Sequence, residues 1–267
     1  SSCEWVKQMK KRLPKDLHDN VYHRSDLTNK FIKDIISKKN VLIIMDEIQI
    51  AAKENQSIYK TFHEAGFYNK KKLLNNDIKI ISFSATPDGV FYDIKGWNDN
   101  SKIIKMVPGE GYTSCFDLKN TYRVIQYKDL CGYNKTNGMI DQELVDYNIN
   151  EMKEYIDEYK EYKYHIIRTP NGSMGDIVIN NFKKIMGEDI IYHKYDKESD
   201  IEDINNILKI TPEEDIFIFI KEKLRCAKTL NKTYLGIVYE RYTKSADDAV
   251  VIQGLIGRGT GYDDNGE

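Results

Sequence analysis

Residues 40–49 read NVLIIMDEIQ, in which the five apolar residues 41–45 are followed at once by the carboxylates of Asp46 and Glu47. An uninterrupted apolar run of this length is typical of a strand that is covered on both faces of a parallel sheet. A second such run occupies residues 78–83 (IKIISF), and residues 55–65 between them have helical spacing. The stretch therefore predicts a strand–helix–strand unit of the α/β class.

A second alternation of apolar runs and amphipathic segments follows a connecting region that is rich in Gly, Asn, Asp and Pro. It predicts further parallel strands joined by right-handed crossovers. The length of 267 residues fits two domains, and we place them at residues 1–120 and 121–267. The strands are expected at residues 164–168, 189–193, 215–220 and 234–239, and the helices at residues 141–162, 174–186, 201–208 and 225–230 and from about residue 247.

The composition excludes several classes of protein. Forty basic and 42 acidic residues nearly cancel, so a contact with nucleic acid must come from a local surface and not from the global field. No apolar run approaches the roughly 18 to 20 residues of a membrane-spanning helix. The four cysteines lack metal-ligand spacing, which fits a reducing compartment, cytoplasmic or nuclear, and not secretion.

Asp46 and Glu47 follow the end of a predicted buried strand, which is where ligands bind in open α/β sheets. An Asp at this place can hold Mg²⁺, and a neighbouring Glu can orient and deprotonate an attacking water. The alternative is that Asp46 caps the next helix and Glu47 is a solvated acid in its first turn. Ser84-Ala85-Thr86, which follows the second apolar run, favours the first interpretation because it is expected at the same edge of the sheet.

These motifs resemble those of superfamily 2 helicases. Residues 46–49 (DEIQ) are similar to motif II, residues 84–87 (SATP) to motif III and residues 254–261 (GLIGRGTG) to motif VI. Residues 168–170 (RTP) stand in the place of motif IV, and residues 223–229 (KLRCAKT) follow a predicted strand as motif V does. The resemblance covers nearly the whole chain and is strongest to helicases of large DNA viruses. It implies two RecA-like domains with parallel sheets, ATP and Mg²⁺ as cofactors, and DNA or RNA as partner, with DNA favoured.

The resemblance also implies roles for individual residues. It makes Glu47, Gln49 and the arginine finger Arg258 catalytic, and it gives Ser84, Ala85 and Thr86 the coupling of hydrolysis to movement. ATP would be bound by Asp46, which also holds the metal, and by Thr229, Gln253 and Gly257. Nucleic acid would be bound by Ser1, Ser2, Arg168, Thr169, Arg225 and Lys228.

Two of these assignments have a plainer alternative. The basic segment around Arg225 and Lys228 could be a solvated turn, since phosphate contacts use residue types that ordinary surfaces also carry. Thr169 with Pro170 could merely end the preceding strand.

The sequence also departs from the pattern of the family. The second Arg of motif VI is Gly261 here, and Gln253 lies one position earlier than the usual Gln or His. No Gly-x-x-x-x-Gly-Lys-Ser/Thr loop occurs, so we expect a piece that starts at motif Ia, lacks the first strand and phosphate loop, and alone binds ATP weakly or not at all. The competing interpretation is a degenerate helicase-like module that binds nucleic acid or protein without hydrolysis.

Overall fold

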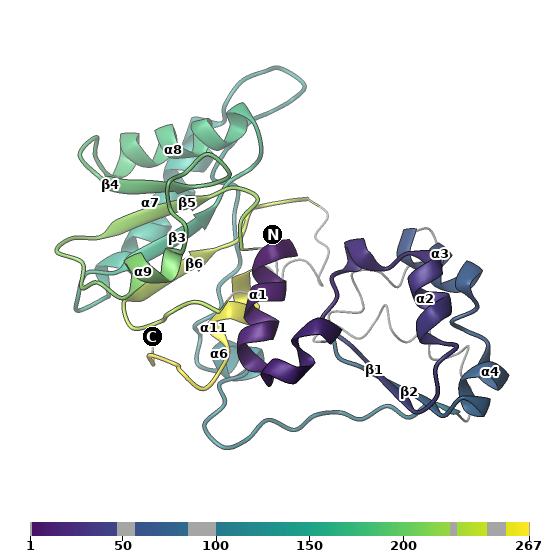
Figure 1. The fold of residues 1–267 in the computed structure, drawn as a ribbon. Helices are drawn as coiled ribbons and strands as arrows, with labels where there is room; N and C mark the ends of the chain where they lie inside the picture. Colours follow the sequence, from purple (N-terminus) through teal and green to yellow (C-terminus); the bar gives the residue numbers. More distant parts are fainter. Residues whose placement is uncertain (1, 47–56, 85–99, 225–228, 245–254, 267) are drawn as a thin grey trace. The chain divides into compact units, whose positions relative to one another are not determined.

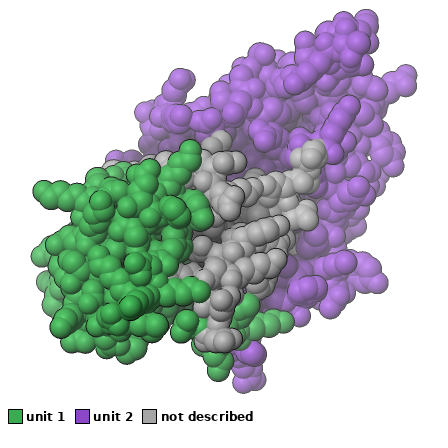
Figure 2. All heavy atoms as spheres, turned by 90° about the vertical axis from the view of Figure 1, so that its right-hand side faces the viewer, with its two compact units in different colours: residues 1–106 green, residues 107–267 purple. Residues whose placement is uncertain are grey.

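A computed structural model describes residues 2–46, 57–84, 100–224, 229–244 and 255–266 of the chain. It divides into two compact units, Ser1–Met106 and Val107–Glu267, which are coloured separately in Figure 2. Each unit is described by itself below.

The first unit contains two parallel strands, β1 (Val41–Met45) and β2 (Ile78–Ser82), which pair from Val41 opposite Ile78 to Met45 opposite Ser82. Asn40 and Asp77 precede the strands with positive φ angles of 58° and 49°, a conformation that short polar residues tolerate. The helical elements are α1 (Ser2–Arg12), η1 (Lys15–Asn20), η2 (Arg24–Asp26), α2 (Asn29–Ile35), α3 (Ser57–Ala65) and α4 (Lys70–Asn75).

One face of this sheet packs on a core and the other does not within the described residues. Val41, Ile43 and Met45 lie against the core that α2, α3 and α4 supply, whereas Leu42 and Ile44 are 54% and 61% exposed. The expectation that β1 is covered on both faces was therefore wrong for the described part of the unit. The alternation of exposed and covered residues is that of a strand with one packed face.

The second unit is built on a four-stranded sheet in which every strand is parallel to its neighbours. The strand order is β4-β5-β3-β6, so the connection from β3 to β4 and that from β5 to β6 each pass over a strand. The strands are β3 (Tyr164–Arg168), β4 (Ile191–Tyr195), β5 (Ile216–Ile220) and β6 (Leu235–Tyr239), and the helices are α6 (Cys115–Asn120), α7 (Gln142–Asp157), α8 (Ser173–Met186), α9 (Ile204–Leu208) and α11 (Gly257–Gly259).

Helices cover both faces of this sheet, and Figure 1 shows α8 and α9 on opposite sides of it. Residues of α7 and α8 pack with Phe217 and Phe219 on one face, while residues of α9 pack with Ile218 and Ile220 on the other. Alternate residues of β5 thus enter different cores, which explains its continuous apolar sequence. The predicted α/β class with parallel sheets is confirmed.

The division between the units falls at residues 106 and 107, whereas the sequence placed it at 120 and 121. Residues 107–120 join the second unit because they bind its C-terminal segment. Thr113 and Gly261 exchange two backbone hydrogen bonds of 2.8 and 3.0 Å, and Leu118 of α6 lies against Gly259 of α11. These contacts are distant in sequence, so local patterns do not reveal them.

The predicted strands of both units lie within two residues of those observed. The helix expected at residues 225–230 and the start of the last helix fall largely outside the described residues. No helix in the described ranges is long and apolar enough to span a membrane.

Candidate functional site

The carboxyl ends of β1 and β2 lie side by side in the first unit. Met45 pairs with Ser82, and the N–H of Phe83 donates to the carbonyl of Met45 across 2.8 Å, which extends the ladder by one step. Asp46 and Ser84 therefore leave the same edge of the sheet from neighbouring strands. Asp46 is exposed, Ser84 is half-buried, and both take part in further interactions of the protein.

No group of three or more His, Cys, Asp or Glu side chains that could hold a metal ion occurs in the part of the chain that the structure describes. Mg²⁺ prefers oxygen ligands and keeps several waters, so a protein can supply as few as one or two carboxylates to such a site. Asp46 and Ser84 are the described residues that would supply those oxygens. The glycine-rich cradle that usually holds the phosphates has no counterpart in the sequence.

Several of the site residues expected from the sequence lie outside the described residues. These are Ser1, Glu47, Gln49, Ala85, Thr86, Arg225, Lys228 and Gln253.

In the second unit, Arg168 ends β3 and its guanidinium is enclosed by other groups of the same unit. Nε lies 2.9 and 3.0 Å from the two carboxylate oxygens of Glu240, which follows β6. Nη1 donates to the carbonyl of Lys223 at 2.8 Å and Nη2 to that of Leu224 at 3.1 Å. Both ionic side chains are only 10% exposed, so this is a largely buried ion pair with additional hydrogen bonds.

Arg258 reaches the same backbone group. It lies in α11 directly after Gly257, its side chain is buried, and its Nη2 donates to the carbonyl of Leu224 at 2.7 Å. One carbonyl oxygen therefore accepts hydrogen bonds from both Arg168 and Arg258. The structure brings together the segments that the sequence assigned to motif IV, the start of motif V and motif VI.

The remaining described candidates lie elsewhere. Thr169 is buried, and its N–H donates to the carbonyl of Ile220 at 3.0 Å, which continues the β3–β5 ladder. Its hydroxyl donates to the same carbonyl at 3.3 Å. Thr229 is exposed, and its carbonyl accepts from the side chain of Asn205 in α9. Ser2 is the first residue of α1. Both polar groups of Thr169 that can donate are therefore directed to the neighbouring strand β5.

Gly261 has a structural reason to replace the expected arginine. Its φ of 136° disfavours any L side chain, and a Cβ there would lie 2.9 Å from Oδ1 of Asp263 and 3.1 Å from Nζ of Lys232. The Lys232 ammonium is itself buried and donates to Asp263 and to the carbonyl of Thr260 at 2.7 and 2.6 Å. The space beside Gly261 is occupied by this ion pair.

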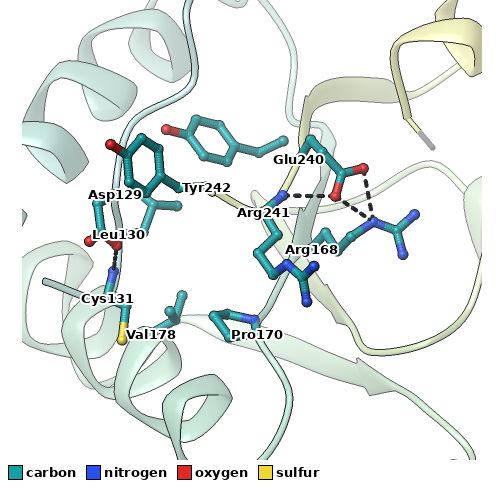
Figure 3. A pocket seen from close by; sticks show the side chains of 10 residues that line it. Asp129, Leu130, Cys131, Arg168, Pro170, Val178, Glu240, Arg241 and Tyr242 are labelled. Atoms are coloured by element: carbon teal, nitrogen blue, oxygen red, sulfur yellow. Dashed lines mark hydrogen bonds and ion pairs between the residues drawn. The ribbon is translucent and has the colours of Figure 1, made fainter. Parts of the chain in front are cut away.

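A shallow hollow adjoins the Arg168–Glu240 pair, and Figure 3 shows Arg241 and Pro170 on its wall. The N–H of Arg241 donates to Glu240 at 2.9 Å, while the exposed guanidinium of Arg241 has no ion pair among the described residues. Burial raises the pKa of the neighbouring Tyr239 to about 12, so its hydroxyl stays protonated.

Sequence reasoning missed Glu240. The signal that could have found it is a lone acid directly after the apolar run of β6, matching Arg168 directly after that of β3.

Comparisons with known proteins identify one distant relative. No protein-family model and no solved structure matches the chain. The chain is 28% identical over 282 residues to a protein of Acanthamoeba polyphaga mimivirus named "Uncharacterized protein L594". The match covers 98% of this chain and 65% of the relative, so the chain spans about two thirds of that protein's length.

Proposed function

We propose that this chain is the motor portion of an ATP-dependent helicase or translocase of superfamily 2 that moves along DNA or RNA, in which the two units are RecA-like domains. The observation that carries the proposal is the shared carbonyl of Leu224. It joins Arg168, the start of the proposed motif V and the proposed arginine finger Arg258 at one edge of a parallel sheet. A composite nucleotide site needs residues that are far apart in the chain to meet in space, and this meeting of three separate segments supports the proposal.

In this proposal the acidic edge of the first unit and Arg258 have complementary roles. Asp46 would hold Mg²⁺, which when bound neutralises charge on the phosphates. Glu47 would orient a water and accept its proton, and Arg258 would stabilise charge that develops on the transferred phosphoryl group. Ser84, which leaves the same edge as Asp46, would couple occupancy of that edge to movement.

The test is nucleic-acid-stimulated ATP hydrolysis by the full-length protein. Glu47→Gln removes the proposed base while it keeps side-chain size, and we expect the stimulated rate to fall by about 100-fold or more. Glu64→Gln makes the same change at an exposed position of α3 and should leave the rate unchanged. Equal rates for wild type and Glu47→Gln would contradict the assignment.

One observation favours a second candidate, a binding module that does not hydrolyse ATP. Arg258 is buried and donates to a carbonyl of its own unit, and the position of the second motif VI arginine is a glycine packed against Lys232. Calorimetric titration of the full-length protein with Mg-ATP separates the two candidates. A protein that binds nucleic acid, shows no heat of ATP binding and hydrolyses no ATP would support the module.

A further inference from the structure

Arg168 and Arg258 both donate through Nη2 to the carbonyl oxygen of Leu224, at 3.1 and 2.7 Å. We infer that Arg168, held by Glu240, is a positioning residue that acts through this carbonyl to set the place of Arg258. The inference rests on the proposed function for its kinetic consequence. Its structural part, that the position of Arg258 depends on Arg168, rests on the hydrogen bonds alone.

Arg168 is itself fixed from several sides. Its Nε lies between the two carboxylate oxygens of Glu240, and Nη1 and Nη2 donate to successive carbonyls, those of Lys223 and Leu224. The planar guanidinium presents its donors in a rigid fork, so satisfying three directions at once leaves it little freedom to rotate. A lysine at this position could pair with Glu240, but its donors sit on one nitrogen and lack the fork that reaches the carboxylate and the two carbonyls from three separate nitrogens.

The backbone around residues 222–224, to which Arg168 donates its hydrogen bonds, has an unusual conformation. Leu224 has a φ of 55° and Glu222 a φ of 57°, the left-handed region that non-glycine residues seldom adopt. Such conformations persist where the surroundings over-determine them, and they collect at functional sites. Here the buried Leu224 side chain anchors the turn in the core on one side, and the two arginines hold its carbonyl on the other.

Glu240 completes the arrangement because it prevents an uncompensated buried charge. Its carboxylate pairs with Arg168 and also accepts the N–H of Arg241, so it is fixed at the end of β6 as Arg168 is at the end of β3 (Figure 3). Removing one partner of a buried pair leaves the other desolvated and unpaired. The carbonyl that Arg258 uses is therefore held by a pair that spans two neighbouring strands.

The kinetic test is a double-mutant cycle on kcat for ATP hydrolysis by the full-length protein. We expect Arg168→Gln and Arg258→Gln each to lower kcat by about 100-fold, with KM for ATP changed less than about threefold. Because Arg168 acts through Arg258, the double variant should be no slower than Arg258→Gln alone. A double variant whose loss is the product of the two single losses would overturn the inference.

Two further variants guard against a purely structural effect. Arg168→Lys keeps the charge beside Glu240, so we expect it to recover the stability that Arg168→Gln loses but not its kcat. Full recovery of kcat in Arg168→Lys would show that only the charge matters and would overturn the inference. Lys194→Gln removes an exposed ion pair with Asp176 in the same unit and should leave kcat unchanged. Urea unfolding of each variant shows whether it is folded.

A second measurement does not depend on ATP hydrolysis. In the full-length protein, NMR of labelled arginine side chains should show slow hydrogen exchange at Arg258 Nη, which Arg168→Gln accelerates by about tenfold or more while Lys194→Gln does not. Unchanged exchange in Arg168→Gln would overturn the inference. A wild-type protein without ATPase activity would instead overturn the proposed function, and the exchange measurement would still decide the role of Arg168.

Discussion

Arg123 grips the carboxylate of Asp264 with both terminal nitrogens, Nη1 to Oδ1 at 2.9 Å and Nη2 to Oδ2 at 3.0 Å. The two residues are 141 positions apart in the chain. The hydroxyl of Thr113 donates to the same Oδ2 at 3.0 Å. This bidentate pair joins the start of the second unit to the segment that follows α11, and charge-assisted bidentate pairs are stronger than hydrogen bonds between neutral groups.

Asp264→Asn should destabilise the second unit, because the amide removes the charge that the Arg123 fork recognises. Hydrogen bonds to charged groups contribute about 1.5 to 3 kcal/mol, and we expect a loss in that range in the free energy of unfolding measured with urea. Asp200→Asn makes the same change at an exposed residue and should shift the free energy by less than about 0.5 kcal/mol. Equal losses in the free energy of unfolding for the two substitutions would show that the Arg123–Asp264 pair contributes no specific stability.

The stability of the second unit should fall in acid. Burial raises the pKa of Asp215, but hydrogen bonds from His165 and from the N–H of Lys163 lower it by more, so the pKa in the folded state lies below the ordinary 3.8. A depressed carboxyl pKa contributes stability that is complete above the unfolded value. That contribution is lost as the pH falls from 3.8 through the folded pKa.

The measurement is the midpoint of urea unfolding between about pH 6 and about pH 2. Asp215→Asn keeps an acceptor for His165 and Lys163 but no longer titrates, so its midpoint should fall less steeply with acid than that of the wild type. The pKa of Asp264 is likewise lowered, first by its hydrogen bond with Arg123, so some acid sensitivity remains in the variant. Parallel curves for wild type and variant would contradict the prediction.

Gly261→Ala should cost more than a substitution at an ordinary glycine of positive φ. The new Cβ would meet Oδ1 of Asp263 and Nζ of Lys232 in addition to the strain of a φ of 136°. Gly111→Ala is the matched control, since Gly111 has a φ of 80° and open space around it. We expect a loss of about 2 to 3 kcal/mol at Gly261 and about 1 kcal/mol at Gly111 in urea unfolding.

The two faces of the first sheet give predictions of different size for two adjacent isoleucines. Ile43→Thr places a hydroxyl in the core and should cost about 2 kcal/mol, while Ile44→Thr on the exposed face should cost less than about 0.5 kcal/mol. Thr is also β-branched, so strand propensity changes little in either variant. A large loss at Ile44 in the full-length protein would show that another part of that protein covers this face.

Much of the fold follows from local patterns in the sequence. The strands of the second unit are apolar runs bounded by turns, and residues such as Phe217 and Ile218 point to opposite faces of a covered sheet, so period and length both identify them. The same reasoning predicted that β1 is covered on both faces, which was wrong for the described residues. An apolar run does not tell whether a second layer is present, and Leu42 and Ile44 are exposed in the described part of the unit.

The site around Arg168 and Arg258 is less predictable, because its contacts involve backbone carbonyls and pairs of residues that are far apart in the sequence. The sequence singled out Arg168 and Arg258, but their common acceptor is a carbonyl, which every residue possesses. The left-handed conformation of Leu224 has no signature in its side chain. Glu240 and Asp264 are recognisable only after strand order and chain path place them beside their arginines.

The two hydrogen bonds between Thr113 and Gly261 hold the first and last segments of the second unit side by side. The ion pair between Arg123 and Asp264 joins the same two segments. All four strands of the sheet lie between these segments in the sequence. Chains of this kind tolerate being reopened elsewhere when their ends are joined. A circularly permuted second unit, cut at the exposed turn near residue 213 and linked from 266 to 107, would keep every strand neighbour it has now.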